Sequence, residues 1–188
     1  KINLIKKVIK LQDRSNIILI NNKDYKKTNM VESFFKAFEK IDQDVIVSYS
    51  DIIYEASLLK KMISFKFNHI LLKSDWKKVW EQRMSAREIK SDAEDIRVNK
   101  NFITEIGAKI QKKLPKYQFM GLIRLNYNSL KKIKKFYKKI NNNKIDFTSF
   151  INLLIQKKIT KFKYRQTKKY WFEIDTQKDL IASKKFFK

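Results

Sequence analysis

The sequence predicts an α/β domain in which helices cover a mixed, mostly parallel central sheet. Short apolar runs that are typical of strands alternate along the chain with amphipathic stretches of helical period. Strands that alternate with helices are typical of parallel sheets. The 188 residues contain only two Gly and one Pro and no repeat or linker. We therefore expect a single domain over residues 1–188.

The predicted elements follow from these patterns in chain order. Residues 1–10 resemble the end of an amphipathic helix or a helix–strand junction. Thr28 or Asn29 can cap a helix that has Glu32 near its start. Further helical spacing lies at residues 55–63, 76–84, 129–140 and 147–157 and from residue 177. Strand patterns lie at residues 16–20, 44–48, 69–72, 119–125, 159–164 and 170–174, with a hairpin at 96–98 and 102–106.

The composition excludes several classes of site. Without cysteine the chain has no disulfide framework, no thiolate zinc site and no cysteine nucleophile. His69 is the only histidine, which excludes a histidine-rich metal site, and it lies within a predicted strand, where a core role is expected. No apolar run approaches the roughly 20 residues that a membrane helix needs. We expect a soluble, cytoplasmic protein without a membrane partner.

The net charge of +25 leaves a polyanionic partner open. However, the chain has 38 Lys against 6 Arg, whereas nucleic-acid readers usually rely on Arg. The densest lysine run, residues 131–139, alternates with Ile133, Phe136 and Tyr137 at helical spacing, so its lysines occupy the solvated face of an ordinary helix. A biased composition is the favoured explanation, and a lysine-rich nucleic-acid-binding module is the alternative function.

Two acidic residues are candidates for chemistry. Asp51 follows the strand at 44–48, and in open α/β sheets ligands bind at the carboxyl ends of strands. Position alone equally allows Asp51 to cap a helix that begins near Ile53. Asp175 precedes the last helix, which it or Thr176 can cap. If Asp51 and Asp175 converge, they form an oxygen site suited to Mg²⁺ and to phosphoryl or nucleotidyl transfer.

Other polar and aromatic residues allow less specific predictions. The acidic run 92–95 is by itself typical of a solvated loop, and no GxGxxG or P-loop motif is present. Trp76 and Trp80 share a helix face and are expected to pack together. A quaternary ammonium acceptor requires an aromatic face near an acid. The side chains that can supply these are Tyr170, Trp171 and Glu173, or Tyr25 and Tyr117. Phe172 is expected in the core, whereas the pattern allows Trp171 to be either a core residue or part of the site.

Several stretches together resemble one enzyme family. Residues 47–55 resemble the segment that carries the first metal aspartate of nucleotide-diphosphosugar-type nucleotidyltransferases, and residues 22–29 resemble the Asn-Pro-x-Tyr-x-x-Thr-Asn-Asn stretch of the choline-phosphate cytidylyltransferase branch. Residues 171–176 with Asp179-Leu180 resemble the closing motif of that branch. The intervening motifs occur in the same order at 75–76, 91–95, 103–107 and 119–123. The similarity extends to the cytidylyltransferase-like domains found beside phosphoenolpyruvate mutase in phosphonate and surface-polysaccharide pathways.

The resemblance implies a Rossmann-like three-layer fold and a Mg²⁺-dependent reaction. A phosphate oxygen of phosphocholine, 2-aminoethylphosphonate or a sugar 1-phosphate attacks the α-phosphate of CTP or another NTP, and pyrophosphate leaves. By position, Asp51 and Asp175 become the catalytic metal ligands. The substrate-binding residues become Tyr25, Thr28, Asn29, Tyr170, Trp171 and Glu173. A phosphoenolpyruvate mutase domain, fused or adjacent, is an implied partner.

The chain also departs from that family. The opening strand, the glycine-rich signature loop and its activating Lys or Arg would precede residue 1, so no nucleotide-binding residues can be assigned. We expect a fragment that lacks this N-terminal segment and does not bind CTP productively by itself, and a catalytically inactive family member is a further alternative. Within the chain, Lys23 replaces Pro, Met30 replaces Asn and Ser50 replaces Gly. Phe147-Thr148-Ser149 stands in place of Met-Thr-Asp, which leaves Ser149 without an expected role.

Overall fold

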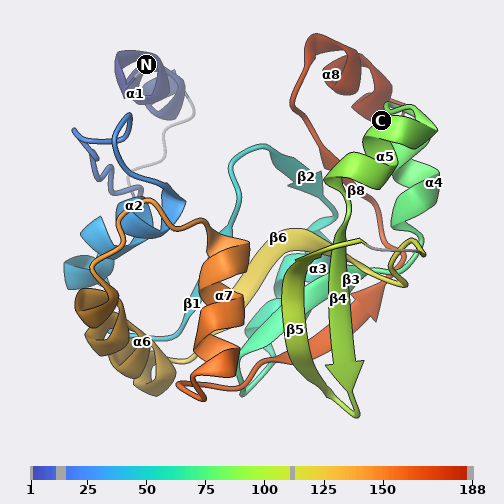
Figure 1. Ribbon diagram of the computed structural model, residues 1–188. Coiled ribbons are helices and arrows are strands. Elements are labelled where there is room, and N and C mark those ends of the chain that lie inside the picture. Colours follow the sequence, from blue (N-terminus) through green and yellow to red (C-terminus); the bar gives the residue numbers. More distant parts are fainter. Residues whose placement is uncertain (1, 12–15, 111–112, 186–188) are drawn as a thin grey trace.

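A computed structural model describes residues 2–11, 16–110 and 113–185 (Figure 1). Its centre is a six-stranded sheet in the order β1-β6-β3-β7-β5-β4. A separate two-stranded ribbon pairs β2 with β8. The strands are β1 (Val45–Ser48), β2 (Ile52–Tyr54), β3 (His69–Lys73), β4 (Glu94–Asn99), β5 (Phe102–Lys109), β6 (Gln118–Leu125), β7 (Lys163–Thr167) and β8 (Trp171–Glu173).

The mixed α/β class is confirmed, but the prediction of a mostly parallel sheet is wrong. Only β3 and β7 are parallel neighbours, and the other neighbouring pairs are antiparallel. Two features cause the difference. Strand β6 runs between β1 and β3 in the opposite direction, and β4 and β5 form a hairpin whose tight turn permits only antiparallel pairing.

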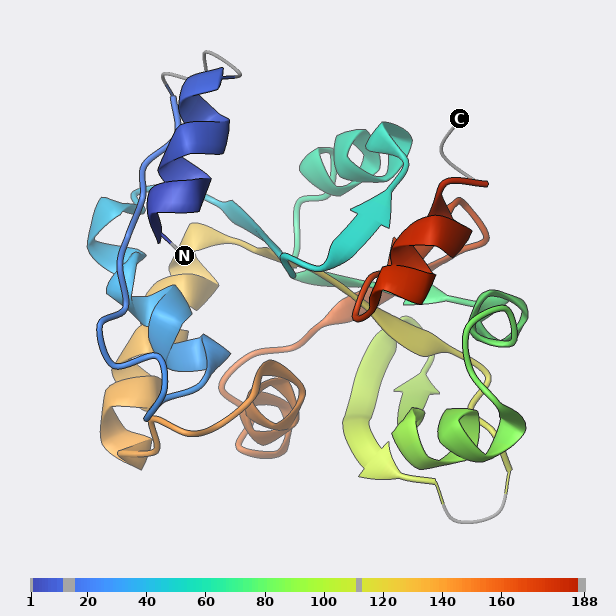
Figure 2. The ribbon, with the colours of Figure 1, turned by 90° about the horizontal axis from the view of Figure 1, so that it is seen from above.

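Helices cover both faces of the sheet and give three layers (Figures 1 and 2). The buried clusters place α2, α6 and α7 on one face and α3, α4 and α5 on the other. The helices are α1 (Ile2–Leu11), α2 (Met30–Lys36), η1 (Phe38–Lys40), α3 (Ala56–Ile63), α4 (Trp76–Trp80), α5 (Ala86–Asp92), α6 (Tyr127–Ile140), α7 (Phe147–Gln156) and α8 (Gln177–Ser183). No helix in the described parts of the chain is long and apolar enough to cross a membrane.

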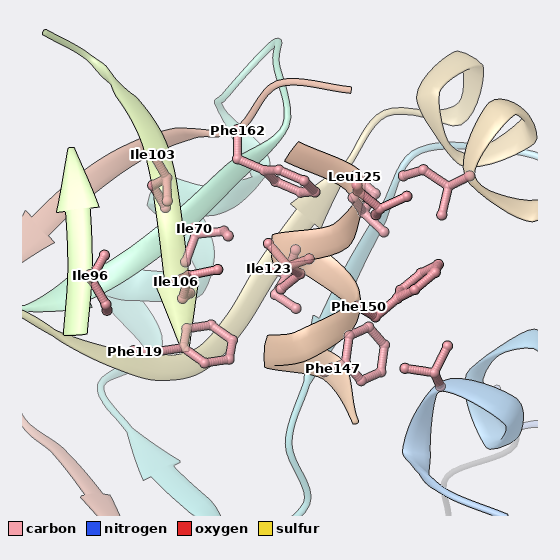
Figure 3. Close-up of a cluster of buried hydrophobic side chains, with 14 of the residues drawn as sticks. Ile70, Ile96, Ile103, Ile106, Phe119, Ile123, Leu125, Phe147, Phe150 and Phe162 are labelled. Carbon is pink, nitrogen blue, oxygen red and sulfur yellow. The ribbon is translucent and has the colours of Figure 1, made fainter. Parts of the chain in front are cut away.

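The central strands are apolar on both faces because each face meets a helical layer. On β6, Ile123 packs with Phe150 of α7, as Figure 3 shows, while Met120 and Leu122 pack on the opposite side with the α3–α5 layer. On β3, Ile70 and Leu72 join the first cluster and Leu71 the second. This alternation follows from the two-residue period of a strand. The sheet therefore supports two separate hydrophobic cores.

Several predicted elements differ from the observed ones. Residues 16–20 form no strand and are largely exposed, with Ile18 exposed by 69%. Strand β7 begins four residues later than the predicted strand at 159–164. The acidic run 92–95 forms no loop, because Asp92 is the last residue of α5 and Glu94 and Asp95 lie within β4. The predicted packing of Trp76 against Trp80 is confirmed by a T-shaped contact of 5.1 Å between ring centroids.

Candidate active site

The β2–β8 ribbon brings the segment that contains Asp51 next to the segment that contains Asp175. Ile52 pairs with Glu173 in the antiparallel register. Beyond that pair, the amide of Ile174 donates a hydrogen bond of 2.8 Å to the carbonyl oxygen of Asp51. Asp51 therefore lies directly before β2 and Asp175 directly after this bond. Two acidic residues from distant parts of the sequence lie at one end of the same short ribbon.

Neither Asp51 nor Asp175 is used as a helix cap. No helix begins near Ile53, because residues 52–54 form β2, and α3 starts at Ala56. At the C-terminal helix, the hydroxyl of Thr176 accepts from the amide of Asp179, and the Asp179 carboxylate accepts from the Thr176 amide at 2.8 Å. This reciprocal capping box satisfies the start of α8 without Asp175. The capping alternatives that the sequence left open for both residues are thereby removed.

Arg83, which follows α4, forms a buried clamp on this acidic cluster. Its side chain is only 4% exposed, and its two Nη atoms donate to Asp175 at 2.7 Å and to Glu173 at 2.6 Å. Asp179 lies 3.5 Å from Nη1. Burial disfavours the charged guanidinium, but the bond to Asp175 and the charges of Glu173 and Asp179 outweigh this and raise the pKa of Arg83. The clamp fixes the direction of the loop that carries Asp175.

Negative charge remains in excess around Glu173 despite this arginine. The pKa of Glu173 is raised to about 7. Burial is the largest cause, Arg83 acts in the opposite direction, and the charges of Asp175, Asp51 and Asp92 also raise it. Since Asp51 and Asp175 both act on this carboxyl group, the three acids share one electrostatic environment. Crowded carboxylates of this kind are relieved by a bound cation.

A hollow of about 360 Å³ adjoins Asp51 and extends between the end of β1 and the first turns of α2 and α7. Its lining is formed by Met30, Ser33, Phe34, residues 47–51 and Phe147. Tyr49 is held there by close packing on Gly121 of β6. Gly121 has a positive φ of +71°, and a Cβ atom at that position would lie 2.9 Å from Cγ of Tyr49. Only glycine allows the ring to lie this close to the strand.

A second group of acids reaches the same region from β4 and α7. Burial raises the pKa of Glu94, the charge of Asp146 adds to this, and the Thr148 hydroxyl hydrogen-bonds the carboxylate and partly offsets it. Burial also raises the pKa of Tyr49, where Thr148 again opposes the effect and the charges of Asp146, Glu94 and Asp51 support it. Glu94 and Asp146 therefore lie within electrostatic range of the hollow beside Asp51. Sequence reasoning had not assigned them to the site.

The predicted substrate-binding residues take different places. Thr28 and Asn29 serve the fold, because the Thr28 hydroxyl donates to the Asp24 carbonyl at 3.0 Å and the Asn29 side chain accepts from the amide of Met30 at 2.7 Å. Tyr25 is exposed in the preceding loop. The residues that follow this segment and line the hollow are Met30, Ser33 and Phe34 of α2.

The aromatic residues at β8 are also separated from one another. Trp171 is only 3% exposed and donates from its indole nitrogen to the carbonyl of Met120 at 2.9 Å, so it is a core residue. Phe172 is buried, as expected. Tyr170 lines a different cavity together with Lys73 and Lys168. Of the residues predicted at this end, Glu173 is the one that the structure places beside Asp51 and Asp175.

The donor set fits Mg²⁺. No group of three or more Asp, Glu or His side chains arranged for a metal is found within residues 2–11, 16–110 and 113–185. Mg²⁺ does not require one, because it usually takes one or two carboxylates and completes its shell with waters and substrate phosphates. Asp51 and Asp175 are exposed carboxylates, and Asp175 keeps 53% of its side chain accessible in spite of its bond to Arg83.

The sequence is similar to that of a known cytidylyltransferase. The chain is 32% identical over 181 residues to the CTP:phosphoglutamine cytidylyltransferase of Campylobacter jejuni, with 85% of the chain and 68% of that protein covered. The chain belongs to the cytidylyltransferase-like nucleotidyltransferases. No family model matches the sequence.

Solved structures of nucleotidyltransferases share the fold. The inositol-1-phosphate CTP transferase of T. maritima has a TM-score of 0.70 at 19% identity, covering 94% of this chain and 67% of that one. The CTP:phosphocholine cytidylyltransferase of Streptococcus pneumoniae has a TM-score of 0.70 at 12% identity, covering 98% and 75%. At these identities the likeness concerns the Rossmann-like fold, which agrees with the fold that the sequence motifs implied.

The reaction class of this cytidylyltransferase-like enzyme is nucleotidyl transfer involving phosphorylated substrates. The two glycines of the chain, Gly107 and Gly121, both lie within strands, where they accommodate Thr148 and Tyr49. No glycine-rich phosphate loop is therefore present in these 188 residues. The part of the candidate site that these residues form is the acidic part around Asp51, Glu173 and Asp175.

Proposed function

We propose that the protein transfers a cytidylyl group from CTP to a small phosphorylated acceptor with the help of Mg²⁺. The observation that carries this proposal is the Ile174–Asp51 hydrogen bond, which holds Asp51 and Asp175 at one end of the β2–β8 ribbon. The relatives whose names include CTP support the choice of nucleotide.

In the proposed reaction, an anionic phosphate oxygen of the acceptor attacks the α-phosphorus of CTP. A new P–O bond forms, the bond from the α-phosphorus to the bridging oxygen breaks, and pyrophosphate leaves. The attacking oxygen is already anionic, so no general base is needed, in keeping with a site that contains no histidine or cysteine. Asp51 and Asp175 would hold Mg²⁺, which supplies neutralisation of the charge that develops on the phosphate oxygens.

The acidic surroundings also bear on the acceptor. In a chain of net charge +25, the acids Glu94, Asp146 and Glu173 lie near Asp51 or near Tyr49 beside it. These acids favour an acceptor with an amino or ammonium group, such as phosphocholine or 2-aminoethylphosphonate, over a neutral sugar 1-phosphate. Phosphoglutamine is a further acceptor to test, because the Campylobacter relative is named for it.

The test is pyrophosphate release by the full-length protein that contains this chain. CTP is supplied with Mg²⁺ and, in parallel, with phosphoglutamine, phosphocholine, 2-aminoethylphosphonate and glucose 1-phosphate. We expect turnover with an amine-bearing acceptor and none when Mg²⁺ is omitted. Turnover that is unaffected by Asp51→Ala and Asp175→Ala contradicts the assigned site, and turnover with glucose 1-phosphate alone contradicts the acceptor class.

A further inference from the structure

A second hollow, of about 400 Å³, lies at the end of the sheet where the central strands β3 and β7 begin. It is formed by the loop before β3 and by the first residues of β3 and β7. Strands β3 and β7 are parallel and begin together, with His69 beside Lys163. The acidic site instead lies beyond the carboxyl end of β1, which runs in the same direction as β3 because both are antiparallel to β6. The two hollows are therefore separated by the length of the strands.

The charge of this second hollow is positive and uncompensated. Lys66, Lys163 and Arg165 line it, and none of its lining residues is an Asp or Glu. Within the described residues none of these three cations forms an ion pair, although Arg83, Arg97 and Arg124 are all paired with carboxylates. Unpaired cations that converge on a concave surface attract and bind anions, and phosphate is the anion that Arg and Lys most often bind.

The remaining walls are aromatic. Phe67 is 56% exposed, and the Lys163 ammonium lies 4.1 Å from its ring centroid. Phe65 stacks on His69 with 4.1 Å between the ring centroids, and Tyr164 also lines the hollow. Lys163 covers one face of the Phe67 ring, and the exposed remainder of the ring is a surface on which a planar heteroaromatic ring can stack.

His69 adds a hydrogen-bond acceptor. Its Nδ1 lies 2.9 Å from the Phe67 carbonyl oxygen. A carbonyl oxygen can only accept, so Nδ1 carries the proton and Nε2 is the acceptor of the neutral ring. Burial lowers the pKa of His69, and Lys163, Arg165 and Arg124 lower it further, so the neutral ring is favoured near pH 7. An acceptor among several cations suits a ligand that carries both N–H or O–H donors and a phosphate.

The volume narrows the ligand class. At roughly 30 Å³ for each water, the hollow holds about 13 waters, far more than a lone phosphate occupies. It also falls within the size range of roughly 300–1,000 Å³ that small-molecule sites cover. A planar ring joined to a phosphate matches the volume, the charge and the aromatic walls together.

We propose that this hollow is a second ligand site for a nucleoside monophosphate, with Lys66, Lys163 and Arg165 on the phosphate, Phe67 on the base and His69 accepting from a ligand donor. This site goes beyond the proposed transfer reaction, because it lies at the opposite end of the sheet from Asp51 and Asp175. A ligand there leaves the acidic site open, because the two hollows lie at opposite ends of the strands.

The probe is adenosine 5′-monophosphate, titrated into the protein without Mg²⁺ and followed by calorimetry and by the NMR signals of residues 64–69. The test variants are the double change Lys163→Ala/Arg165→Ala and the single change Phe67→Ala. A matched double change, Lys132→Ala/Lys135→Ala, removes two exposed lysines from α6. We expect each test variant to bind roughly tenfold more weakly or worse, and the matched control to bind like wild type.

Four results overturn the proposal. They are equal affinity in the test variants and wild type, equal weakening in the α6 control, orthophosphate binding as tightly as the nucleotide, and a strong preference for single-stranded oligonucleotides over the mononucleotide. Asp51→Asn and Asp175→Asn should leave this binding intact while abolishing turnover, so failure of this site and failure of the proposed reaction are distinguishable. Phe67 and Arg165 are exposed, so their truncation leaves the cores untouched.

Discussion

The amide of Ile174 donates a 2.8 Å hydrogen bond to the carbonyl oxygen of Asp51, and this contact joins the segment after β1 to the segment before α8. It places Asp175 beside Asp51, while Thr176 takes over the capping of α8. Arg83 donates hydrogen bonds of 2.7 Å to Asp175 and 2.6 Å to Glu173. The site is thus positioned by main-chain pairing and oriented by one buried arginine.

Asp51→Ala and Asp175→Ala should each lower the rate of pyrophosphate release by about 100-fold or more, because each removes an oxygen ligand from the proposed Mg²⁺ site. Asp51 is exposed, so Asp51→Ala should change the midpoint of urea unfolding little. Asp175→Ala also removes a hydrogen bond from the buried Arg83 and should lower that midpoint. Asp42→Ala, at an exposed acid before β1, serves as the control and should retain the wild-type rate. Wild-type rates in both aspartate variants would remove these residues from the mechanism.

Arg83→Met should destabilise the fold by about 3 kcal/mol or more, because it leaves the carboxylates of Glu173 and Asp179 crowded without their cation. Urea unfolding measures the effect. Arg87→Met, on the exposed surface of α5, is the control and should cost less than about 0.5 kcal/mol. Equal unfolding midpoints for the two variants would show that the ion pairs of Arg83 do not stabilise the fold.

Glu173 should make stability depend on pH. Its pKa rises from 4.5 to about 7 in the folded protein, so the folded state retains the proton that the unfolded state has lost. The contribution of this group to stability is therefore complete below about pH 4.5 and is lost as the pH rises through about 7. Unfolding by urea at several pH values should show this loss, and Glu173→Gln should reduce it. An NMR titration midpoint near 4.5 for this carboxyl group would contradict the assignment.

Gly121→Ala should destabilise the protein by about 1–3 kcal/mol, since it combines a strained positive φ with a contact of 2.9 Å on the Tyr49 ring. The same change in a Tyr49→Ala background separates the two causes, because only the backbone strain then remains. A smaller cost in that background is expected from thermal or urea unfolding. Equal losses of stability in the two backgrounds would mean that contact between the added Cβ atom and the Tyr49 ring contributes nothing to the effect of Gly121→Ala.

The 188-residue chain by itself should bind CTP weakly even with Mg²⁺. Both of its glycines lie within strands, and no glycine-rich phosphate loop is available in these residues. Calorimetric titration of CTP in the presence of Mg²⁺ measures the affinity. Tight, saturable binding would contradict this expectation and would place the nucleotide among these 188 residues.

Much of the fold could be predicted because local patterns determine it. Periodicity located β1, β3, β6, α6 and α7, and the order of the motifs indicated the family. The strand directions could not be predicted, because β6 inserts between β1 and β3 through contacts far apart in sequence. Residues 16–20 have the apolar composition of a strand but pair with no strand in the described parts of the chain.

Residues of the candidate site could be proposed from the sequence only where a carboxylate directly follows or precedes a clear strand or helix pattern. Asp51 and Asp175 met that condition, since each directly follows or precedes a clear element. Arg83 lacked such a signal, because its three acidic partners lie about 90 residues further along the chain. Glu94 belongs to an acidic run that is typical of a solvated loop, whereas in the structure it lies within β4 and is partly buried.

The β2–β8 ribbon has a consequence for biosynthesis. Its strands are three residues each, yet most of the polypeptide lies between them, so closing this ribbon costs chain entropy that only a nearly complete domain can recover. Asp51 is synthesised well before Ile174 and acquires its proposed partner acid only after it. A translation product that stops before Ile174 therefore carries Asp51 without the main-chain bond that brings Asp175 to it.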